Sequence, residues 1–308
     1  MPLMDNLLGI FAYSLHKRTH LTLLRQSSTE MKEYIDQLHK RQEDGESRQE
    51  HWAIVDWLTP INYAPQQSDF IARRQEGTGQ WLLDSNEFQV WLKQSEQTMF
   101  CPGMPGAGKT IIASIVVDYV YTTFQNDASI GIAYLYCNFR RHQEQKDVYL
   151  LANLLKQLVQ EQPSMPEKVK SLYNCHKDKR TYPSVSEISK VLQSVAANYS
   201  RCFIIVDALD ECQVSDGSRR RLLSELFNLR DNTSVSLFIT SRFILEIEKE
   251  FKGSISLEIR ASHDDVQRYL DGKMSLLRPF VSKNLTLQAE IKTEIVKAVD
   301  GMYVHSIL

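Results

Sequence analysis

Apolar residues along the chain form short continuous runs that alternate with segments of helical periodicity. The runs have the length of buried strands, and the periodic segments have the pattern of helices. Predicted strands occupy residues 98–101, 130–136, 202–206, 235–239 and 255–259. Predicted helices occupy residues 111–117, 148–159, 184–197, 222–229 and 264–270. Because strands that alternate with helices form parallel sheets covered on both faces, the predicted fold class is α/β, with a five-stranded parallel sheet sandwiched by helices.

The first 58 residues follow another pattern. Apolar side chains, among them Met31, Ile35 and Leu38, recur at helical spacing, and residues 41–50 are strongly charged. Such an amphipathic helical arm needs a surface against which to bury its apolar stripe. That surface is either the arm's own domain or a partner, which can be a second copy of the chain.

Two prolines, Pro60 and Pro65, interrupt the helical pattern and predict a linker after the arm. We therefore expect three parts. Residues 1–69 form the helical N-terminal arm and its linker, residues 70–260 form the α/β domain, and residues 261–308 begin a helical domain.

A glycine-rich loop joins the first predicted strand to the first predicted helix. Residues 103–110 read GMPGAGKT and fit the pattern G-x-x-x-x-G-K-[ST] of phosphate-binding loops. Glycines let consecutive backbone N–H groups turn toward phosphate oxygens, and the N-terminus of the next helix adds partial positive charge. The residues expected to bind a nucleotide here are Gly103, Gly106, Ala107, Gly108, Lys109 and Thr110. The hydroxyl of Thr110 is also a candidate ligand of Mg²⁺.

A second signal ends the third predicted strand. The sequence FIIVDALDE places Asp207 at the carboxyl end of an apolar run, where parallel sheets bind ligands. Asp207 is therefore another candidate ligand of Mg²⁺, and Asp210 or Glu211 is expected to orient the water that attacks the γ-phosphate. The next strand, in the sequence LFITSR, brings Arg242 to the same edge, where a guanidinium suits phosphate oxygens.

The composition is that of an ordinary globular protein and excludes little. Lys and Arg number 36 and Asp and Glu number 38, so the net charge of -2 predicts no nucleic-acid binding. No run approaches the ~20 apolar residues that span a bilayer. Five cysteines without a C-x-x-C pair, and no secretory signal, favour a reducing compartment, so we expect a cytoplasmic location.

In combination, these motifs resemble the NACHT subgroup of the STAND class of P-loop NTPases. The resemblance covers roughly residues 70–275 and rests on GMPGAGKT, FIIVDALDE and FITSR in this order, followed by LEIRASHDDVQRYL. The segment GTGQWLL at residues 77–83 is similar to the corresponding segment of fungal-type members, which are grouped with the nephrocystin-like N-terminal domain.

This resemblance implies a nucleotide-gated signalling switch. In that family ADP holds a closed monomer, and ATP permits opening and self-association. The strand before the phosphate loop is implied to lie between the last strand and the strand that ends at Arg242. Family members continue into a helical domain, a winged-helix domain and repeats. Because this sequence stops where the helical domain begins, we expect a C-terminally truncated form.

Two functions from different classes stay open on the sequence alone. The first is a module that binds ATP or ADP with Mg²⁺ and hydrolyses ATP slowly. GTP is disfavoured because the guanine-reading motif Asn-Lys-x-Asp is absent from the sequence. The second is an interaction scaffold that works through its N-terminal helices and holds nucleotide only structurally. A kinase or transferase is disfavoured, since no acceptor site is visible and the acidic pair suits water activation better.

Overall fold

The computed structural model describes residues 31–298, except residues 33, 36, 142–144, 213–216, 275–276 and 283. It divides into two compact units, residues 1–53 and 54–308. The expected domain boundaries at residues 69 and 260 stay predictions. The part of the predicted arm before residue 31 and the last ten residues lie outside the described residues.

In the first unit, residues 37–53 are helical and mostly exposed. Met31, Tyr34, Ile35 and Leu38 are exposed by 61%, 61%, 43% and 43%. Side chains three, four and seven positions apart share one face of a helix, so the predicted apolar stripe lies at the surface of this unit.

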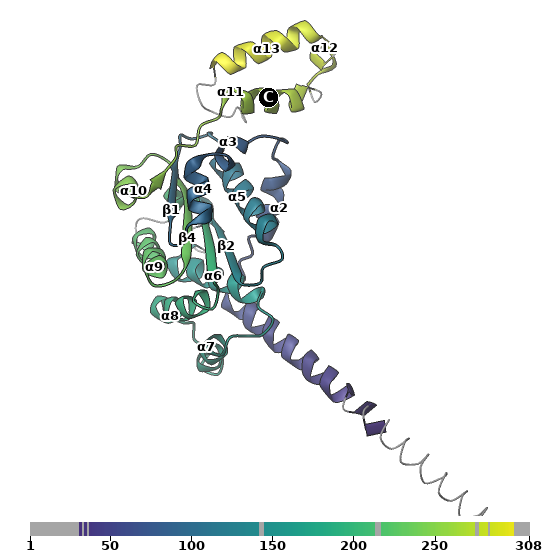
Figure 1. Cartoon of the computed structure of the whole chain (residues 1–308), viewed down its shortest axis with the longest axis vertical. Helices are drawn as coiled ribbons and strands as arrows, with labels where there is room; N and C mark the ends of the chain where they lie inside the picture. The colour runs from purple at the N-terminus through teal and green to yellow at the C-terminus, as the bar shows by residue number, and fades with distance from the viewer. Residues whose placement is uncertain are drawn as a thin grey trace, which may run out of the picture. The chain divides into compact units, whose positions relative to one another are not determined.

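The second unit is built on a parallel sheet with the strand order β2-β3-β4-β1-β5. Figure 1 labels β1, β4 and β2 of this sheet. The strands are β1 (Thr98–Pro102), β2 (Ile130–Tyr136), β3 (Arg201–Asp207), β4 (Val235–Ser241) and β5 (Ile255–Ser256). Residues 54–58 are helical, and the further helices before β2 are α2 (Ala64–Ala72), α3 (Gln80–Leu83), α4 (Asn86–Lys93) and α5 (Lys109–Phe124). Those between β2 and β4 are η1 (Phe139–Arg141), α6 (Asp147–Gln160), α7 (Glu167–Lys177), α8 (Val185–Ala196), η2 (Leu209–Glu211) and α9 (Ser218–Asn232). The last are α10 (Leu245–Glu250), α11 (His263–Met274), α12 (Pro279–Ser282) and α13 (Leu285–Ala298).

The sheet confirms the predicted fold class and strand order, with β1 between β4 and β5. Strand β5 is shorter than the predicted run of residues 255–259. The chain beyond it still hydrogen-bonds to β1, since Leu257 N donates to Phe100 O (3.1 Å) and Ile259 N donates to Pro102 O (2.7 Å). It leaves the regular ladder because it lies at an edge of the sheet and has a neighbour on one side only.

Helices cover both faces of the sheet. Helix α5 packs against β2, β3 and β4, and α2 packs on α5. Helices α6, α8 and α9 pack on one another, α6 against β2 and α9 against β4. Crossovers between parallel strands are right-handed, and the connections from β1 to β2 and from β2 to β3 run in opposite directions along the sheet. The two groups therefore lie on opposite faces, and Figure 1 shows α2, α4 and α5 together, apart from α8 and α9.

The segment before β1 is more helical than the sequence indicated. Pro65 does not end a helix but lies in the first turn of α2, where its missing N–H leaves no bond unmade. Helix α4 places Trp91 in the core, fully buried, and Trp91 Nε1 donates to Leu237 O at 2.9 Å. Arg201 of β3 donates to the carbonyls of Trp91, Leu92 and Gln94 at the C-terminal end of α4. These bonds attach the segment before the phosphate loop to the strands beside it.

Candidate nucleotide site

The carboxyl ends of four strands meet at one edge of the sheet. The parallel registers place Pro102 of β1 opposite Ser241 of β4, and Tyr136 of β2 opposite Asp207 of β3. A pocket of about 440 Å³ lies at this edge. Its lining includes eight predicted residues: Gly106, Gly108, Lys109, Thr110, Asp207, Asp210, Glu211 and Arg242. The remaining two, Gly103 and Ala107, belong to the same loop but do not line the pocket.

The backbone of the phosphate loop explains its composition. Gly106 and Gly108 have φ angles of 79° and 85°, in the left-handed region that favours glycine. At position 103 glycine is required by lack of space, because a Cβ atom there would lie 2.6 Å from the carbonyl oxygen of Ile259. Ala107 is fully buried beneath the loop. The motif therefore specifies a loop shape that larger residues would disrupt.

Lys109 begins α5 and lies at its positively polarised N-terminus. Its Nζ donates to the carbonyls of Gly103 and Met104, both at 2.8 Å. Burial lowers the pKa of Lys109, and the nearby carboxylates of Asp210 and Asp207 partly offset this effect. An ammonium group has three donors, so one N–H remains for a ligand in the pocket.

Asp207 is the most buried carboxylate of the site, with 2% of its surface exposed. Thr110 donates to its Oδ2 and Thr240 donates to its Oδ1, both at 2.7 Å. Burial raises the pKa of Asp207 to about 6, although both hydroxyl bonds and the positive charge of Lys109 lower it. A buried carboxylate of this kind favours a cation nearby. Together with the Thr110 hydroxyl it offers the hard oxygen ligands that Mg²⁺ prefers, so the residues present fit this ion.

The acidic loop after β3 turns sharply at Ala208. This residue has a φ of 53°, a conformation that is uncommon for any residue other than glycine. The strain is offset by a hydrogen bond from Ala208 N to Thr240 Oγ1 at 2.9 Å. Because of this turn, η2 lies over the pocket and presents Asp210 and Glu211. Such strain is frequent at functional sites.

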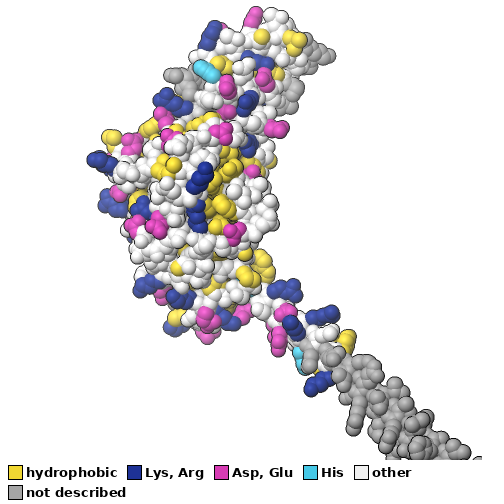
Figure 2. Space-filling model, viewed as in Figure 1, with side chains coloured by type: hydrophobic (Ala, Val, Ile, Leu, Met, Phe, Trp, Pro, Cys, Tyr) yellow, Lys and Arg dark blue, Asp and Glu magenta, His cyan; other side chains and the backbone are white. Residues whose placement is uncertain are grey.

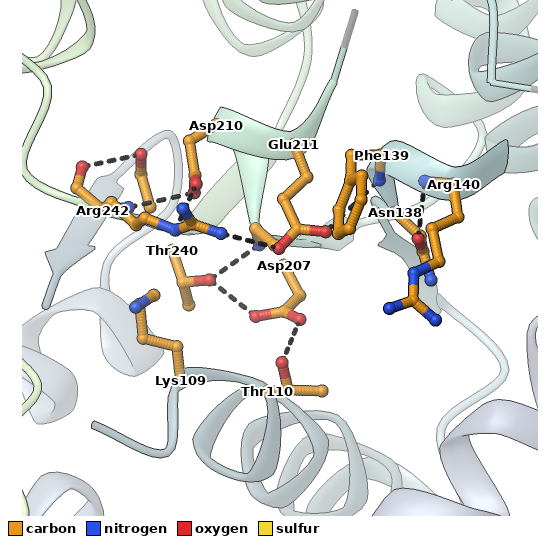
Figure 3. Close-up of polar contacts among 12 residues, drawn as sticks. Lys109, Thr110, Asn138, Phe139, Arg140, Asp207, Asp210, Glu211, Thr240 and Arg242 are labelled. Atoms are coloured by element: carbon orange, nitrogen blue, oxygen red, sulfur yellow. Dashed lines mark hydrogen bonds and ion pairs between the residues drawn. The ribbon is translucent and has the colours of Figure 1, made fainter. Parts of the chain in front are cut away.

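The two carboxylates of η2 have different partners. Asp210 binds Arg242 twice, accepting from its backbone N–H and from its Nε, each at 3.0 Å. Glu211 contacts Arg242 NH2 at 3.3 Å and accepts from the backbone N–H of Phe139, also at 3.3 Å. Figure 3 shows Asp210 and Glu211 turned toward the Arg242 guanidinium, with Glu211 between Arg242 and Phe139. Asp210 therefore holds Arg242 firmly, and the longer contacts of Glu211 leave it freer to move.

The sequence did not predict the wall of the pocket that α2 forms. Gln66 and Phe70 of this helix and Arg73, the residue that follows its last turn, line the pocket at spacings of four and three. The ring of Phe70 meets the ring of Tyr136 edge-on, with centroids 4.8 Å apart. The Oε1 atom of Gln66 is buried, and no hydrogen-bond partner lies within reach among the described residues. Only the helical spacing of these three residues was visible in the sequence, and it does not say that they face a ligand.

Helix α11 also reaches the pocket, through Tyr269. Its Asp265 accepts a hydrogen bond from Gly79 N at 3.0 Å, and Arg268 donates to Gly77 O at 2.6 Å. Gln75 lines the pocket beside this helix, and a Cβ atom at Gly272 of α11 would overlap its amide. The site is therefore assembled from segments almost two hundred residues apart.

On the face drawn in Figure 2, basic and acidic side chains are interspersed over the described residues. No helix in the described part of the chain is long and apolar enough to cross a membrane.

Residues 77–242 match the family described as Nephrocystin 3, N-terminal. This match covers more than half of the chain. The chain belongs to this family.

No curated protein matches the chain. Solved structures are similar at low identity. A DNA replication initiation factor is 14% identical over 73% of this chain and 63% of its own, with a TM-score of 0.37. Domain III of the replication initiation protein DnaA from Thermotoga maritima is 12% identical over 80% of this chain and 85% of its own, with a TM-score of 0.40. A Walker-type ATPase of Pyrococcus abyssi is 12% identical over 75% of this chain and 66% of its own, with a TM-score of 0.46.

The chain thus spans less than two thirds of the first of these structures. At such identities and TM-scores these similarities say nothing about what this member of the nephrocystin 3 N-terminal family binds or does. Its phosphate loop, strand order and flanking helices are those of a P-loop NTPase.

Proposed function

We propose that the chain is an ATP- and ADP-binding module of the NACHT and STAND type, which hydrolyses ATP slowly and thereby changes conformation or self-association. The observation that carries this proposal is the convergence of the phosphate loop, Asp207, Glu211 and Arg242 on one pocket. These groups supply, in one place, what phosphoryl transfer to water needs.

The phosphates are bound by the loop and by Lys109. The backbone N–H groups between Gly106 and Thr110 and the N-terminus of α5 attract negative charge. Lys109 adds a full charge, and its two bonds to loop carbonyls hold the ammonium group at the loop. Thr110 and Asp207 would hold Mg²⁺, which when bound neutralises charge on the phosphates.

Hydrolysis requires a group that orients water and accepts its proton. Asp210 is already engaged at both oxygens by Arg242, so its role is to position the guanidinium. Glu211 has weaker contacts and lines the same pocket, so we assign the orientation of water to Glu211. Arg242 lies beside it and stabilises negative charge that develops on the γ-phosphate.

The base is recognised at the wall formed by α2. Gln66 lines this wall, and its oxygen, which has no partner among the described residues, would accept a hydrogen bond once the side chain turns toward a base. Adenine presents an exocyclic amine where guanine presents a carbonyl oxygen. The edge-on pair of Phe70 and Tyr136 supplies an apolar surface for a flat ring. Gln66 therefore favours ATP over GTP.

Isothermal calorimetry and a phosphate-release assay test the proposal on the whole chain. Wild type is expected to bind ATP and ADP with Mg²⁺, and Lys109→Ala is expected to lose affinity by about 100-fold or more, since a charge-assisted bond to phosphate is removed. Lys93→Ala, an exposed lysine at the end of α4, is the matched control and is expected to bind like wild type. Equal binding by wild type and Lys109→Ala, or no binding by either, contradicts the proposal.

A second candidate function, an interaction scaffold, is favoured by the exposed stripe of the first unit. Met31, Tyr34, Ile35 and Leu38 present a contiguous apolar face that suits a partner helix. Sedimentation of the whole chain and of an Ile35→Asp, Leu38→Asp double variant tests it. Association that is lost in the double variant and kept in Lys109→Ala supports the scaffold. Association that instead follows the bound nucleotide supports the switch.

A further inference from the structure

Two buried cysteines meet beside the acidic loop. Cys137 directly follows β2, and Cys212 directly follows Glu211, the last residue of η2. Their sulfur atoms lie 2.6 Å apart, and the two residues are exposed by only 6% and 3%. Cys137 N donates to the carbonyl of Asp207 at 3.1 Å, so the pairing of β2 with β3 holds the two segments together.

The other three cysteines have no such arrangement. Cys101 and Cys202 are buried within β1 and β3, which are not neighbours in the sheet, and Cys175 is exposed on α7. Among the cysteines, all of which lie in described residues, Cys137 and Cys212 are therefore the pair whose sulfur atoms are in contact.

We propose that Cys137 and Cys212 form a reversible disulfide, a modification site that regulates hydrolysis at the adjoining pocket. The regulatory part rests on the proposed function, while the disulfide does not. The oxidant is a hydroperoxide. The thiolate of one cysteine attacks a peroxide oxygen, the O–O bond breaks, and a sulfenic acid and water form. The second thiol then attacks that sulfur and expels water. Two thiols and one hydrogen peroxide thus yield one disulfide and two waters.

The pocket gives the oxidant its route. Cys137 is one of the residues that line the pocket, whereas Cys212 does not line it and is exposed by only 3%. A nucleotide in the pocket would cover this route. Oxidation is therefore expected to be slower when nucleotide is bound.

The disulfide would join the two segments that hold Glu211. Phe139, two residues after Cys137, donates its N–H to Glu211, and Cys212 is the next residue after Glu211. A covalent link between these segments restrains η2, and Glu211 loses the freedom to turn toward water. Lys109 and Thr110 lie on α5 and are not restrained. Hydrolysis is expected to fall while nucleotide affinity is kept.

The test treats the whole chain with hydrogen peroxide, blocks the remaining thiols, and maps cross-linked peptides by mass spectrometry. Wild type is expected to lose two hydrogens, with Cys137 joined to Cys212, and to regain them with a reductant. Cys137→Ser and Cys212→Ser are each expected to abolish the cross-link, and Cys175→Ser, which removes an exposed thiol, is the control that keeps it. Saturating ATP is expected to slow its formation by about fivefold or more.

Oxidised wild type is expected to hydrolyse ATP at least about fivefold more slowly than reduced wild type, with nucleotide affinity within about twofold. Oxidation at Cys175 alone, or a cross-link between other cysteines, overturns the proposal. Peptide mapping of the oxidised wild type shows which cysteines are joined, even if a serine variant fails to fold. A cross-link in a chain that binds no nucleotide contradicts the proposed function alone. Nucleotide binding without a cross-link contradicts the disulfide alone.

Discussion

The phosphate side of the pocket and the side formed by α2 are built in opposite ways. At the phosphate side, Lys109, Thr110, Asp207 and Arg242 are already paired with loop carbonyls, hydroxyls or carboxylates. At the α2 side, Gln66 presents a buried oxygen that has no partner among the described residues. The first side is electrostatically organised before a ligand arrives, and the second offers one unmade hydrogen bond.

This difference separates affinity from selectivity. Charged groups that contact phosphates treat all nucleoside triphosphates alike, because the phosphates are common to them. Under the proposed function, a single acceptor turned toward the base would distinguish an amine from a carbonyl oxygen. Substitutions at the phosphate side should therefore change the response to ATP and GTP equally, and substitutions at the α2 side should change their ratio.

The largest effect is expected from Glu211→Gln. Loss of the group that accepts a proton from water should slow hydrolysis of ATP and of GTP by about 100-fold or more, with affinities within about threefold of wild type. Phosphate release under saturating nucleotide measures the rate, and calorimetry measures the affinity. Asp210→Asn serves as the comparison, since it frees Arg242 and should weaken binding as well. Hydrolysis by Glu211→Gln at the wild-type rate contradicts the assignment.

A pH-dependent loss of stability is expected from Asp207. Its pKa rises from 3.8 to about 6 on folding, so the native protein binds a proton more tightly than the unfolded chain. Protonation of Asp207 therefore stabilises the folded protein. This stabilisation is complete below about pH 4 and is lost as the pH rises through about 6. Asp207→Asn cannot ionise and therefore does not lose this stability. The unfolding free energy of the variant, relative to that of wild type, should rise by about 2–3 kcal/mol between about pH 4 and pH 8.

Urea unfolding without nucleotide or Mg²⁺ measures this gain. Asp118→Asn, which alters an exposed carboxyl on the same α5 helix that carries Thr110, is the control and should show no such trend. If the difference in unfolding free energy between Asp207→Asn and wild type did not depend on pH, ionisation of Asp207 would not destabilise the folded protein. The phosphate side would then not need a cation to balance this carboxylate.

At the α2 side, Gln66→Ala should weaken ATP binding by about tenfold and leave GTP binding unchanged, because one buried hydrogen bond is lost. The neighbouring Gln67 is the matched control. Its amide bonds to Ser114 O and to the Tyr136 hydroxyl instead of facing the pocket, so Gln67→Ala should lower the melting temperature and keep the ATP-to-GTP ratio. An equal loss for both nucleotides in Gln66→Ala would place the base elsewhere.

The smallest effect is expected from Gly272→Ala on α11. The added methyl group displaces the flexible amide of Gln75, which lines the pocket, so nucleotide affinity should fall by about two- to threefold without a loss of stability. Gly45→Ala has open space around the new methyl group and is the control. A large fall in stability would mean that the backbone of α11 moves instead of Gln75.

Much of the fold could be predicted from the sequence because its signals are local. The apolar run of residues 130–136 coincides with β2, and the strand before the phosphate loop lies between β4 and β5 as the resemblance implied. Strand β5 was over-extended because periodicity does not show where an edge strand leaves its ladder. Helix α2 was missed, since a proline such as Pro65 is compatible with the start of a helix as well as with a break after its end.

For the site, residues within motifs could be predicted and residues between them could not. The spacing of GMPGAGKT and FIIVDALDE indicated that Thr110 and Asp207 lie close together, and they are hydrogen-bonded. Gln66 and Cys137 lie outside the motifs, and Thr240 lies within FITSR without having been singled out. The importance of all three depends on which segments the sheet brings together. The roles of Asp210 and Glu211 were also inseparable in the sequence, because only their contacts with Arg242 and Phe139 distinguish them.

The position of β1 in the sheet also affects the order of folding. This strand precedes β4 and β5 in the chain by more than a hundred residues, yet these two strands are its neighbours in the sheet. Long-range pairings of this kind form slowly, since a large loop must close first. During synthesis the strand before the phosphate loop therefore has no neighbouring strand until β4, which ends at Ser241, has left the ribosome.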